Sequence, residues 1–272
     1  MTQPITSADQ AQENVAYLRA LKELLYQLAD DDFIIAFRGS EWLGLAPHIE
    51  ADVAFSSITQ NTMGHAVMFY ELLEALGEGK ADKIAHERLP HERRNAVYFE
   101  RQNGDGQYWE EPYYDWALAV VRQLLYDTFK KVKLEAITNS SYKPLAAAAE
   151  KVLLEQSYHL AYWRMWLEQL QNANADARSR IQQRIEEAWS CIGDVPVLGE
   201  EKDAMEHYAL VSSESDLKAA WLRAVTAIID TPPNRPFGQE LGNGRIGEHT
   251  ADLHQAIDTF AEVYNSDRKA VW

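Results

Sequence analysis

One stretch of the chain decides the fold: residues 55–76 read FSSITQNTMGHAVMFYELLEAL. Its core-forming side chains recur at alternating steps of three and four residues, which is the spacing of one face of an α-helix. The members of this stripe are Phe55, Ile58, Thr62, His65, Phe69, Leu72 and Leu76. A helix with one apolar face is stable when that face is buried. The stretch therefore predicts a long helix, over about residues 49–76, that packs in a bundle.

A second stripe of the same kind lies in a helix predicted over residues 145–170. Its members are Val152, Gln156, His159, Trp163, Trp166 and Leu170. At 100° per residue each stripe covers roughly a third of the helix circumference, so both should face a core. Each stripe is apolar except at its centre, where a polar residue precedes a histidine by three positions. These pairs are Thr62 with His65 and Gln156 with His159.

Helical patterns extend over most of the remaining chain. Helices are predicted over 7–29, 31–45, 113–138 and 176–192, with weaker signals at 216–229 and 250–264. Ser7 is the expected N-cap of the first helix, and Pro47 follows the end of the second. No strand pattern with period two is present. The sequence predicts an all-α, single-domain protein over 1–272, with a core over about 28–192 and a C-terminal helical extension over about 193–272.

The composition excludes several classes of protein. The apolar fraction is 46%, with eight Trp and thirteen Tyr, which excludes a disordered chain. Acidic residues outnumber basic ones by 42 to 26, and a net charge of −16 argues against nucleic acid as the main partner. No run of apolar residues is long enough to span a membrane. We expect a protein that binds neither nucleic acid nor membrane.

Cysteine usage and the N-terminus favour a cytoplasmic location. The single Cys191 cannot form an internal disulfide, and no Cys/His spacing resembles a zinc site. The first residues show no basic region followed by an apolar run, which a signal peptide would need.

The two histidine pairs indicate a degenerate metal centre. Ferritin-like di-iron bundles carry an inward Glu on two helices and an inward Glu-x-x-His on the other two. Here the acids of those motifs are replaced by Thr62 and Gln156. Glu41, on the apolar side of the helix predicted over 31–45, and Asp127, on the helix predicted over 113–138, are the candidates for the remaining acids. Two iron ions need more carboxylates than this set supplies.

Neighbouring residues bear on whether the centre still holds metal. Glu155 and Asn61 stand one residue before the lost acids, about 100° around their helices, and are not expected to substitute for them. Lys130 or Lys131, within a turn of Asp127, could replace part of the positive charge of a metal. A buried histidine is more often a hydrogen-bonded core residue than a ligand. The favoured interpretation is a ferritin-like scaffold with a structural, vestigial centre and no catalytic or metal-binding residue.

Several segments resemble the PaaC-type subunits of phenylacetyl-CoA ring epoxidases, which are bacterial multicomponent monooxygenases. They are SEWLGLAP (40–47), NTMGH (61–65), ERQNGD (100–105), RQLLYD (122–127), EQSYHL (155–160) and GEHT (247–250). The resemblance runs from about residue 28 to 264. Two departures are Arg101-Gln102, where the family usually has Gln-Pro, and a first helix that looks like an N-terminal extension.

The resemblance implies a division of labour between subunits. In that family a related A subunit holds the di-iron centre and oxidises the aromatic ring of phenylacetyl-CoA, with electrons from NADPH through a flavin and iron–sulfur reductase. The C subunit shares the fold, pairs with the A subunit and is not the oxidant. It implies no cofactor in this chain, a hetero-oligomer with the A and other subunits, and only indirect involvement with phenylacetyl-CoA. Alone, the chain is expected either to self-associate through the surface that binds the A subunit or to be less stable. The many aromatic residues are expected to serve that interface.

The alternative is a free-standing ferritin-like oxidase that uses Glu41, His65, Asp127 and His159 as a reduced ligand set.

Two further sequence features are interpreted as structural and not as binding sites. The segment GNGRIG (242–247) matches a dinucleotide-binding pattern but follows no strand, so a flexible connection is expected. Arg93 and Arg94 are interpreted as a solvated run of charge.

Overall fold

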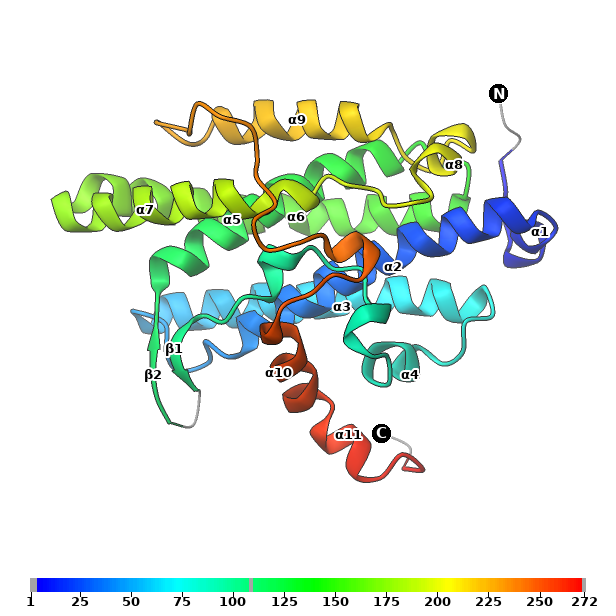
Figure 1. The fold of residues 1–272 in the computed structure, drawn as a ribbon, viewed down its shortest axis with the longest axis horizontal. Helices are drawn as coiled ribbons and strands as arrows, with labels where there is room; N and C mark the ends of the chain where they lie inside the picture. The colour runs from blue at the N-terminus through cyan, green and yellow to red at the C-terminus, as the bar shows by residue number, and fades with distance from the viewer. Residues whose placement is uncertain (1–3, 108–109, 271–272) are drawn as a thin grey trace.

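Four long helices form the body of the molecule in the computed structural model, which describes residues 4–107 and 110–270. α2 (Val15–Ser40) packs against α3 (Ile49–Ala75), and α5 (Trp116–Ile137) packs against α6 (Lys143–Ala173). Each pair is a helical hairpin, and the two hairpins lie against each other (Figure 1). The mostly helical, ferritin-like fold predicted from the sequence is confirmed.

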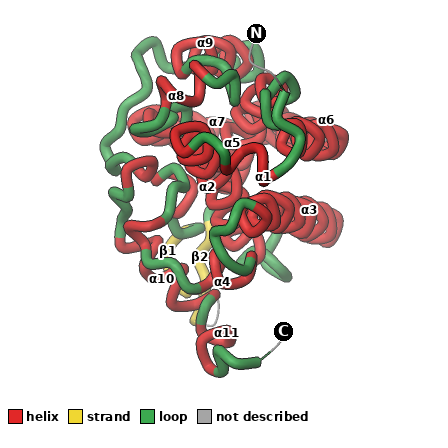
Figure 2. The backbone as a smooth tube through the Cα atoms, turned by 90° about the vertical axis from the view of Figure 1, so that its right-hand side faces the viewer, coloured by secondary structure: helices red, strands yellow, loops and turns green. Residues whose placement is uncertain are grey.

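Shorter helices surround this bundle. They are α1 (Ala8–Gln12), α4 (Ala81–His86), α7 (Ala175–Cys191), α8 (Lys202–His207), α9 (Glu214–Thr226), α10 (Ala251–Phe260) and α11 (Glu262–Ser266), with 3-10 turns η1 (Pro90–Glu92), η2 (Val97–Glu100), η3 (Ile192–Asp194) and η4 (Gly244–Ile246). Figure 2 shows that most of the backbone is helical and that loops and one small hairpin make up the rest. Within the described ranges, no helix is long and apolar enough to cross a bilayer.

The first two predicted helices are wrong in their boundaries. Ser7 does cap a helix, because its hydroxyl accepts a hydrogen bond from the Gln10 amide, but α1 ends at Gln12. A new helix then starts behind the Asn14 cap and continues without a break through residues 29–31. The predicted break at the run of aspartates, residues 30–32, does not occur because all three carboxylates are buried and paired with cations.

Those three aspartates point to different sides of α2, as the 100° step per residue requires. Each therefore meets a cation from a different segment of the chain. The pairs are Asp30 with Arg88, which follows α4, Asp31 with Arg245 of η4, and Asp32 with Lys130 of α5.

A small hairpin interrupts the helical pattern, so the prediction of no strands is also corrected. β1 (Gly104–Gln107) pairs antiparallel with β2 (Glu110–Tyr114) and sets Gly104 opposite Tyr114. The strands are too short for an alternating pattern to register in the sequence. Gly104 is required here, since an added Cβ would lie 2.3 Å from the Tyr113 carbonyl oxygen.

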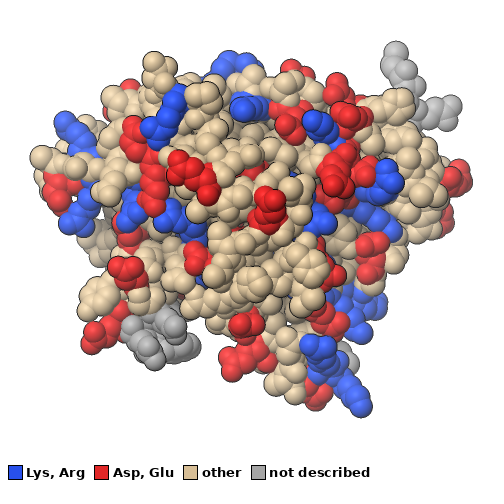
Figure 3. Space-filling view, in the orientation of Figure 1, with Lys and Arg blue, Asp and Glu red and all other residues tan. Residues whose placement is uncertain are grey.

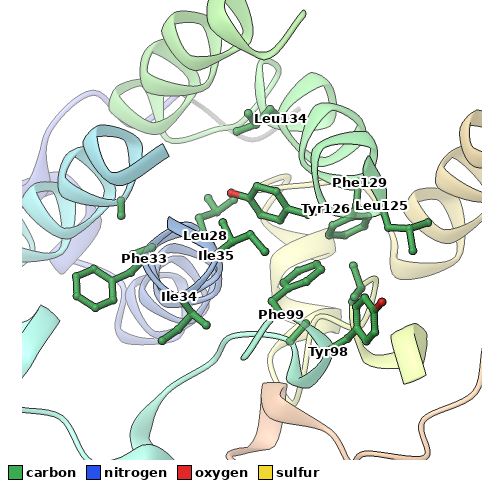
Figure 4. Packing of buried hydrophobic residues seen from close by; sticks show 14 of the residues in the cluster. Leu28, Phe33, Ile34, Ile35, Tyr98, Phe99, Leu125, Tyr126, Phe129 and Leu134 are labelled. Carbon is green, nitrogen blue, oxygen red and sulfur yellow. The ribbon is translucent and has the colours of Figure 1, made fainter. Parts of the chain in front are cut away.

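Most large aromatic residues fill the interior instead of marking an interface. Figure 4 shows Phe99 of η2 and Tyr126 of α5 packed between the helices, with their ring centroids 5.2 Å apart. Trp163 lies edge-on to Phe55 at 4.8 Å. The tryptophans of the described ranges are buried, apart from the half-buried Trp116. The fold itself therefore uses most of the aromatic residues that were expected to serve an interface, although Tyr113 and Tyr158 are exposed.

The segment after α9 crosses the molecule to reach α10 (Figure 1), and Gly244 and Arg245 within it are buried. The Arg245 guanidinium is buried, donates to both Asp31 oxygens and donates to the Val195 carbonyl oxygen at 2.9 Å. An added Cβ on Gly244 would lie 1.9 Å from the Asn95 carbonyl oxygen. The expectation of a flexible connection over 242–247 is wrong, because this segment closes over buried charge.

Arg93 and Arg94 are likewise no solvated run. Arg93 is fully buried, donates to the Ala85 carbonyl oxygen at 2.6 Å, and lies 5.2 Å from the centre of the Phe260 ring. The backbone amide of Arg94 donates to Asp30 at 2.8 Å. Both residues tie the loop after α4 to α2.

Candidate functional site

The two predicted stripes meet in the interior, as expected from their spacing. Thr62 and His65 of α3 and Gln156 and His159 of α6 are all at most 4% exposed. The imidazole rings of His65 and His159 lie 6.1 Å apart, measured between centroids. The inward orientation of both histidines is confirmed.

A chain of hydrogen bonds runs from α2 to the edge of α6 through His65. The Lys130 ammonium lies 2.8 Å from Oδ2 of Asp32 and 2.9 Å from Nδ1 of His65. On the other side of the ring, Nε2 of His65 lies 2.9 Å from Oε2 of Glu155. The Tyr126 hydroxyl donates to the second oxygen of Asp32. We call these residues, Asp32, Lys130, His65 and Glu155, the polar chain.

The polar chain fixes the tautomer of His65. An ammonium group can only donate, so Nδ1 of His65 accepts from Lys130 and Nε2 carries the proton that is donated to Glu155. Burial, and after it the charge of Lys130, lower the pKa of His65 to about 2. The ring is therefore neutral near pH 7, and the positive charge of the centre resides on Lys130.

Asp127 and Gln156 form a second contact beside the polar chain. The Gln156 amide donates to Oδ1 of Asp127 at 2.7 Å. Burial raises the pKa of Asp127 to about 7, against smaller opposing effects from Gln156 and Lys130. Burial also lowers the pKa of His159 to about 4. Near neutral pH this centre thus holds neutral imidazoles and a carboxyl group poised between its two protonation states.

Thr62 and Glu41 do not join these contacts. The Thr62 hydroxyl donates to the Ile58 carbonyl oxygen of its own helix at 2.9 Å. Glu41 follows the end of α2, where its carboxylate accepts from Arg38 at 3.0 Å and from Asn103 at 2.8 Å. There it lines a separate cavity of about 300 Å³. The prediction that Glu41 belongs to the bundle centre is corrected, because the helix that was to carry it inward ends at Ser40.

Asp32 takes the place expected of Glu41, and sequence reasoning missed it. The sequence did contain a signal for buried ion pairs, since residues 30–32 are three consecutive aspartates within an otherwise apolar segment. Glu155 was dismissed for its offset of one residue, yet its long side chain reaches back to His65 from the helix edge. Asn61 approaches His159 in the same way, at 3.4 Å. Of the two lysines predicted as alternative sources of compensating charge, Lys130 reaches the centre, whereas Lys131 lies 3.8 Å from Glu135.

Comparison with known proteins identifies the family. The chain matches the family described as phenylacetic acid catabolic protein over residues 1–272. It belongs to that family. It is also 29% identical over 230 residues to the C subunit of 1,2-phenylacetyl-CoA epoxidase from Escherichia coli (strain K12), and the match covers 84% of this chain and 89% of the relative.

The residues at the centre of the bundle do not fit a di-iron centre. Both nitrogens of the His65 ring already have hydrogen-bond partners, Nδ1 with Lys130 and Nε2 with Glu155, each at 2.9 Å, so neither is free to bind a metal ion. Thr62 and Gln156 cannot supply the anionic oxygens that bridge and neutralise two metal ions. In the described part of the chain, no three His, Cys, Asp or Glu side chains gather in a way that could hold a metal ion.

Proposed function

We propose that the chain is the non-catalytic structural C subunit of a multicomponent phenylacetyl-CoA epoxidase. The observation that carries this proposal is the polar chain, in which a lysine bridges Asp32 and His65 at the centre of a ferritin-like bundle. The Lys130 ammonium donates to Asp32 of α2 and to His65 of α3 and so connects these helices to α5. This role requires no redox chemistry. The family match over the whole chain supports the same assignment.

The proposal assigns the chemistry to other subunits. The di-iron centre belongs to a catalytic A subunit of the same fold, and the flavin and iron–sulfur groups belong to the reductase. This chain holds no cofactor, packs against the A subunit in the cytoplasm and stabilises it. Its involvement with phenylacetyl-CoA is indirect.

The alternative, a free-standing oxidase with Glu41, His65, Asp127 and His159 as ligands, is not favoured. Glu41 bonds to Arg38 and Asn103 instead of meeting the histidines. The lysine next to His65 would repel a metal ion in that position.

Two measurements test the proposal. Oxygen-dependent turnover of phenylacetyl-CoA by the A subunit and reductase should rise at least tenfold when this chain is added, while this chain and the reductase alone show none. Iron analysis of the chain purified alone from iron-rich medium should give well under one ion per chain. Equal turnover with and without the chain, or tightly bound iron near two ions per chain, would contradict the proposal.

A further inference from the structure

α3 has a long stretch without charged residues, and α6 beside it adds exposed apolar side chains. Both helices lie along one side of the molecule in Figure 2. Between Val53 and Tyr70, α3 contains no Asp, Glu, Lys or Arg at all. We define the α3–α6 face by the exposed apolar side chains of these two helices, which are Ile49, Val53, Val67, Leu154, Tyr158 and Met165. Figure 3 shows the opposite side of the molecule, where acidic and basic side chains are scattered among the other residues.

The α3–α6 face is large enough for a stable interface. α3 has 27 residues and α6 has 31, so at about 1.5 Å per residue the shorter helix is about 40 Å long. Two neighbouring helices, each about 10 Å across, then offer on the order of 800 Å², which is the area that each partner contributes to a standard protein–protein interface. Isolated exposed apolar residues are common, but the uncharged stretch of α3 together with the exposed apolar residues of α6 is typical of an interaction site.

A hollow in this face defines what the partner must supply. It has a volume of about 300 Å³ and lies between the two helices, with Ser57, Asn61, Tyr158 and His159 in its lining. Nδ1 of the buried His159 has no hydrogen-bond partner among the described residues. Glu155 also lines the hollow, and only its Oε2 is used, by His65. Covering this carboxylate with apolar groups alone would be costly, so a partner must bring a hydrogen-bond donor to it.

The charge of the chain disfavours a second copy as the occupant. Two copies would each bring a net charge of −16, and each would bring its own Glu155 to the same surface. Lys151, one turn before Glu155 on α6, is the exposed cation nearest to that carboxylate along the helix. A different chain with a cationic or amide side chain on an apolar helix surface fits the hollow without this repulsion.

We infer that the α3–α6 face is the docking surface for a second helical subunit, whose donor side chain enters the hollow and bonds to Glu155. This inference rests on the proposed function, because that function supplies the partner: the catalytic A subunit. Docking would then bury the outer end of the polar chain and connect the partner directly to the centre of this bundle.

Charge insertion tests the surface. Val53→Glu and Tyr158→Glu place a carboxylate at positions that are 63% and 78% exposed, so the thermal midpoint of the isolated chain should not change. Each variant, co-expressed with the tagged A subunit encoded in the same genome, should co-purify at less than a tenth of the wild-type yield. The matched control is Val263→Glu, which is 63% exposed on α11 and should co-purify as the wild type does.

Chemical labelling provides a second measurement. The single native Cys191 is buried, so the exposed Ser57→Cys variant gives a maleimide target in the face itself. Addition of the A subunit should slow its labelling at least tenfold and leave the labelling of Val263→Cys unchanged.

The outcomes separate the two proposals. Failure of the wild-type chain to bind the A subunit overturns the proposed function and this inference with it. Wild-type binding that survives both glutamate substitutions, with labelling at position 57 unchanged, overturns only the docking surface. Loss of self-association in the variants, with A-subunit binding intact, shows that a second copy occupies the face and also overturns the inference.

Discussion

At the scale of single residues, Lys130 decides the character of the bundle centre. It is 4% exposed and bonds both to the carboxylate of Asp32 and to the imidazole of His65. A buried ion pair adds little net stability over apolar packing, but the loss of one partner leaves the other charge uncompensated. Replacement of either Asp32 or Lys130 alone should therefore cost more stability than replacement of both by apolar residues.

Replacement of this lysine should destabilise the protein strongly. Lys130→Met removes the cation and leaves the Asp32 carboxylate buried, so we expect a loss of about 3–5 kcal/mol in the free energy of unfolding. Urea denaturation followed by circular dichroism measures it. Lys131→Met is the control, because Lys131 is partly exposed and 3.8 Å from Glu135, and it should change stability by less than about 1 kcal/mol. Equal effects of the two substitutions would contradict the role of Lys130.

His65 makes stability depend on pH. Its pKa is lowered from 6.5 to about 2, first by burial and then by Lys130, His159 and Lys151. Below pH 6.5 the unfolded chain binds a proton at this ring and the folded chain does not, so acid favours unfolding. His65→Gln keeps an acceptor and a donor but cannot titrate.

We therefore expect the stability of the wild type relative to His65→Gln to fall as the pH decreases from about 6.5 to 4. The limiting slope is about 1.4 kcal/mol per pH unit. Urea unfolding at a series of pH values measures the difference in stability between the two proteins. Asp127, whose raised pKa gives the opposite pH dependence, is present in both proteins and cancels in this difference. Parallel stability curves for the two proteins would show that His65 is charged when folded.

At the scale of elements, periodicity predicted α3 and α6 correctly and mispredicted α2. The stripes of α3 and α6 are regular because one face of each helix is buried and the other is not. α2 is buried on most sides, so its run of aspartates looked like a helix boundary. The basic residues that pair with these aspartates lie far along the chain, so no local sequence pattern predicts the pairs. The histidines could thus be predicted, while Asp32 could be recognised only from tertiary contacts.

The segment over 242–247 is the element most sensitive to a small change. Gly244→Ala brings a Cβ within 1.9 Å of the Asn95 carbonyl oxygen, a backbone atom that cannot rotate away. The segment must shift, and Arg245 with it, so we expect a loss of more than about 2 kcal/mol because the Asp31 charge becomes unpaired. Gly64→Ala is the control: it meets nothing within 4 Å in mid-helix and should stabilise by about 0.5–1 kcal/mol. Thermal unfolding compares the two, and a neutral Gly244→Ala would refute the tight packing.

At the scale of the whole molecule, the C-terminal extension is tied to the bundle through buried charge. Apolar residues from Ala11 to Leu253 belong to one continuous core cluster. We propose that the chain unfolds as one cooperative unit, as the single-domain prediction requires. Scanning calorimetry should give one transition, with a calorimetric enthalpy equal to the van't Hoff enthalpy. Two separated transitions, one of them for residues after 193, would contradict it.

The aspartates of α2 also set the timing of folding during synthesis. The partner of Asp31 lies 214 residues further along the chain, so it leaves the ribosome roughly 10–40 s later at the usual rates of translation. Until then the Asp31 carboxylate lacks the two guanidinium hydrogen bonds that it accepts in the folded protein. A product that terminates before Arg245 never receives that cation. We expect such a product to be less stable than the full chain, because folding would bury the Asp31 carboxylate without its cation.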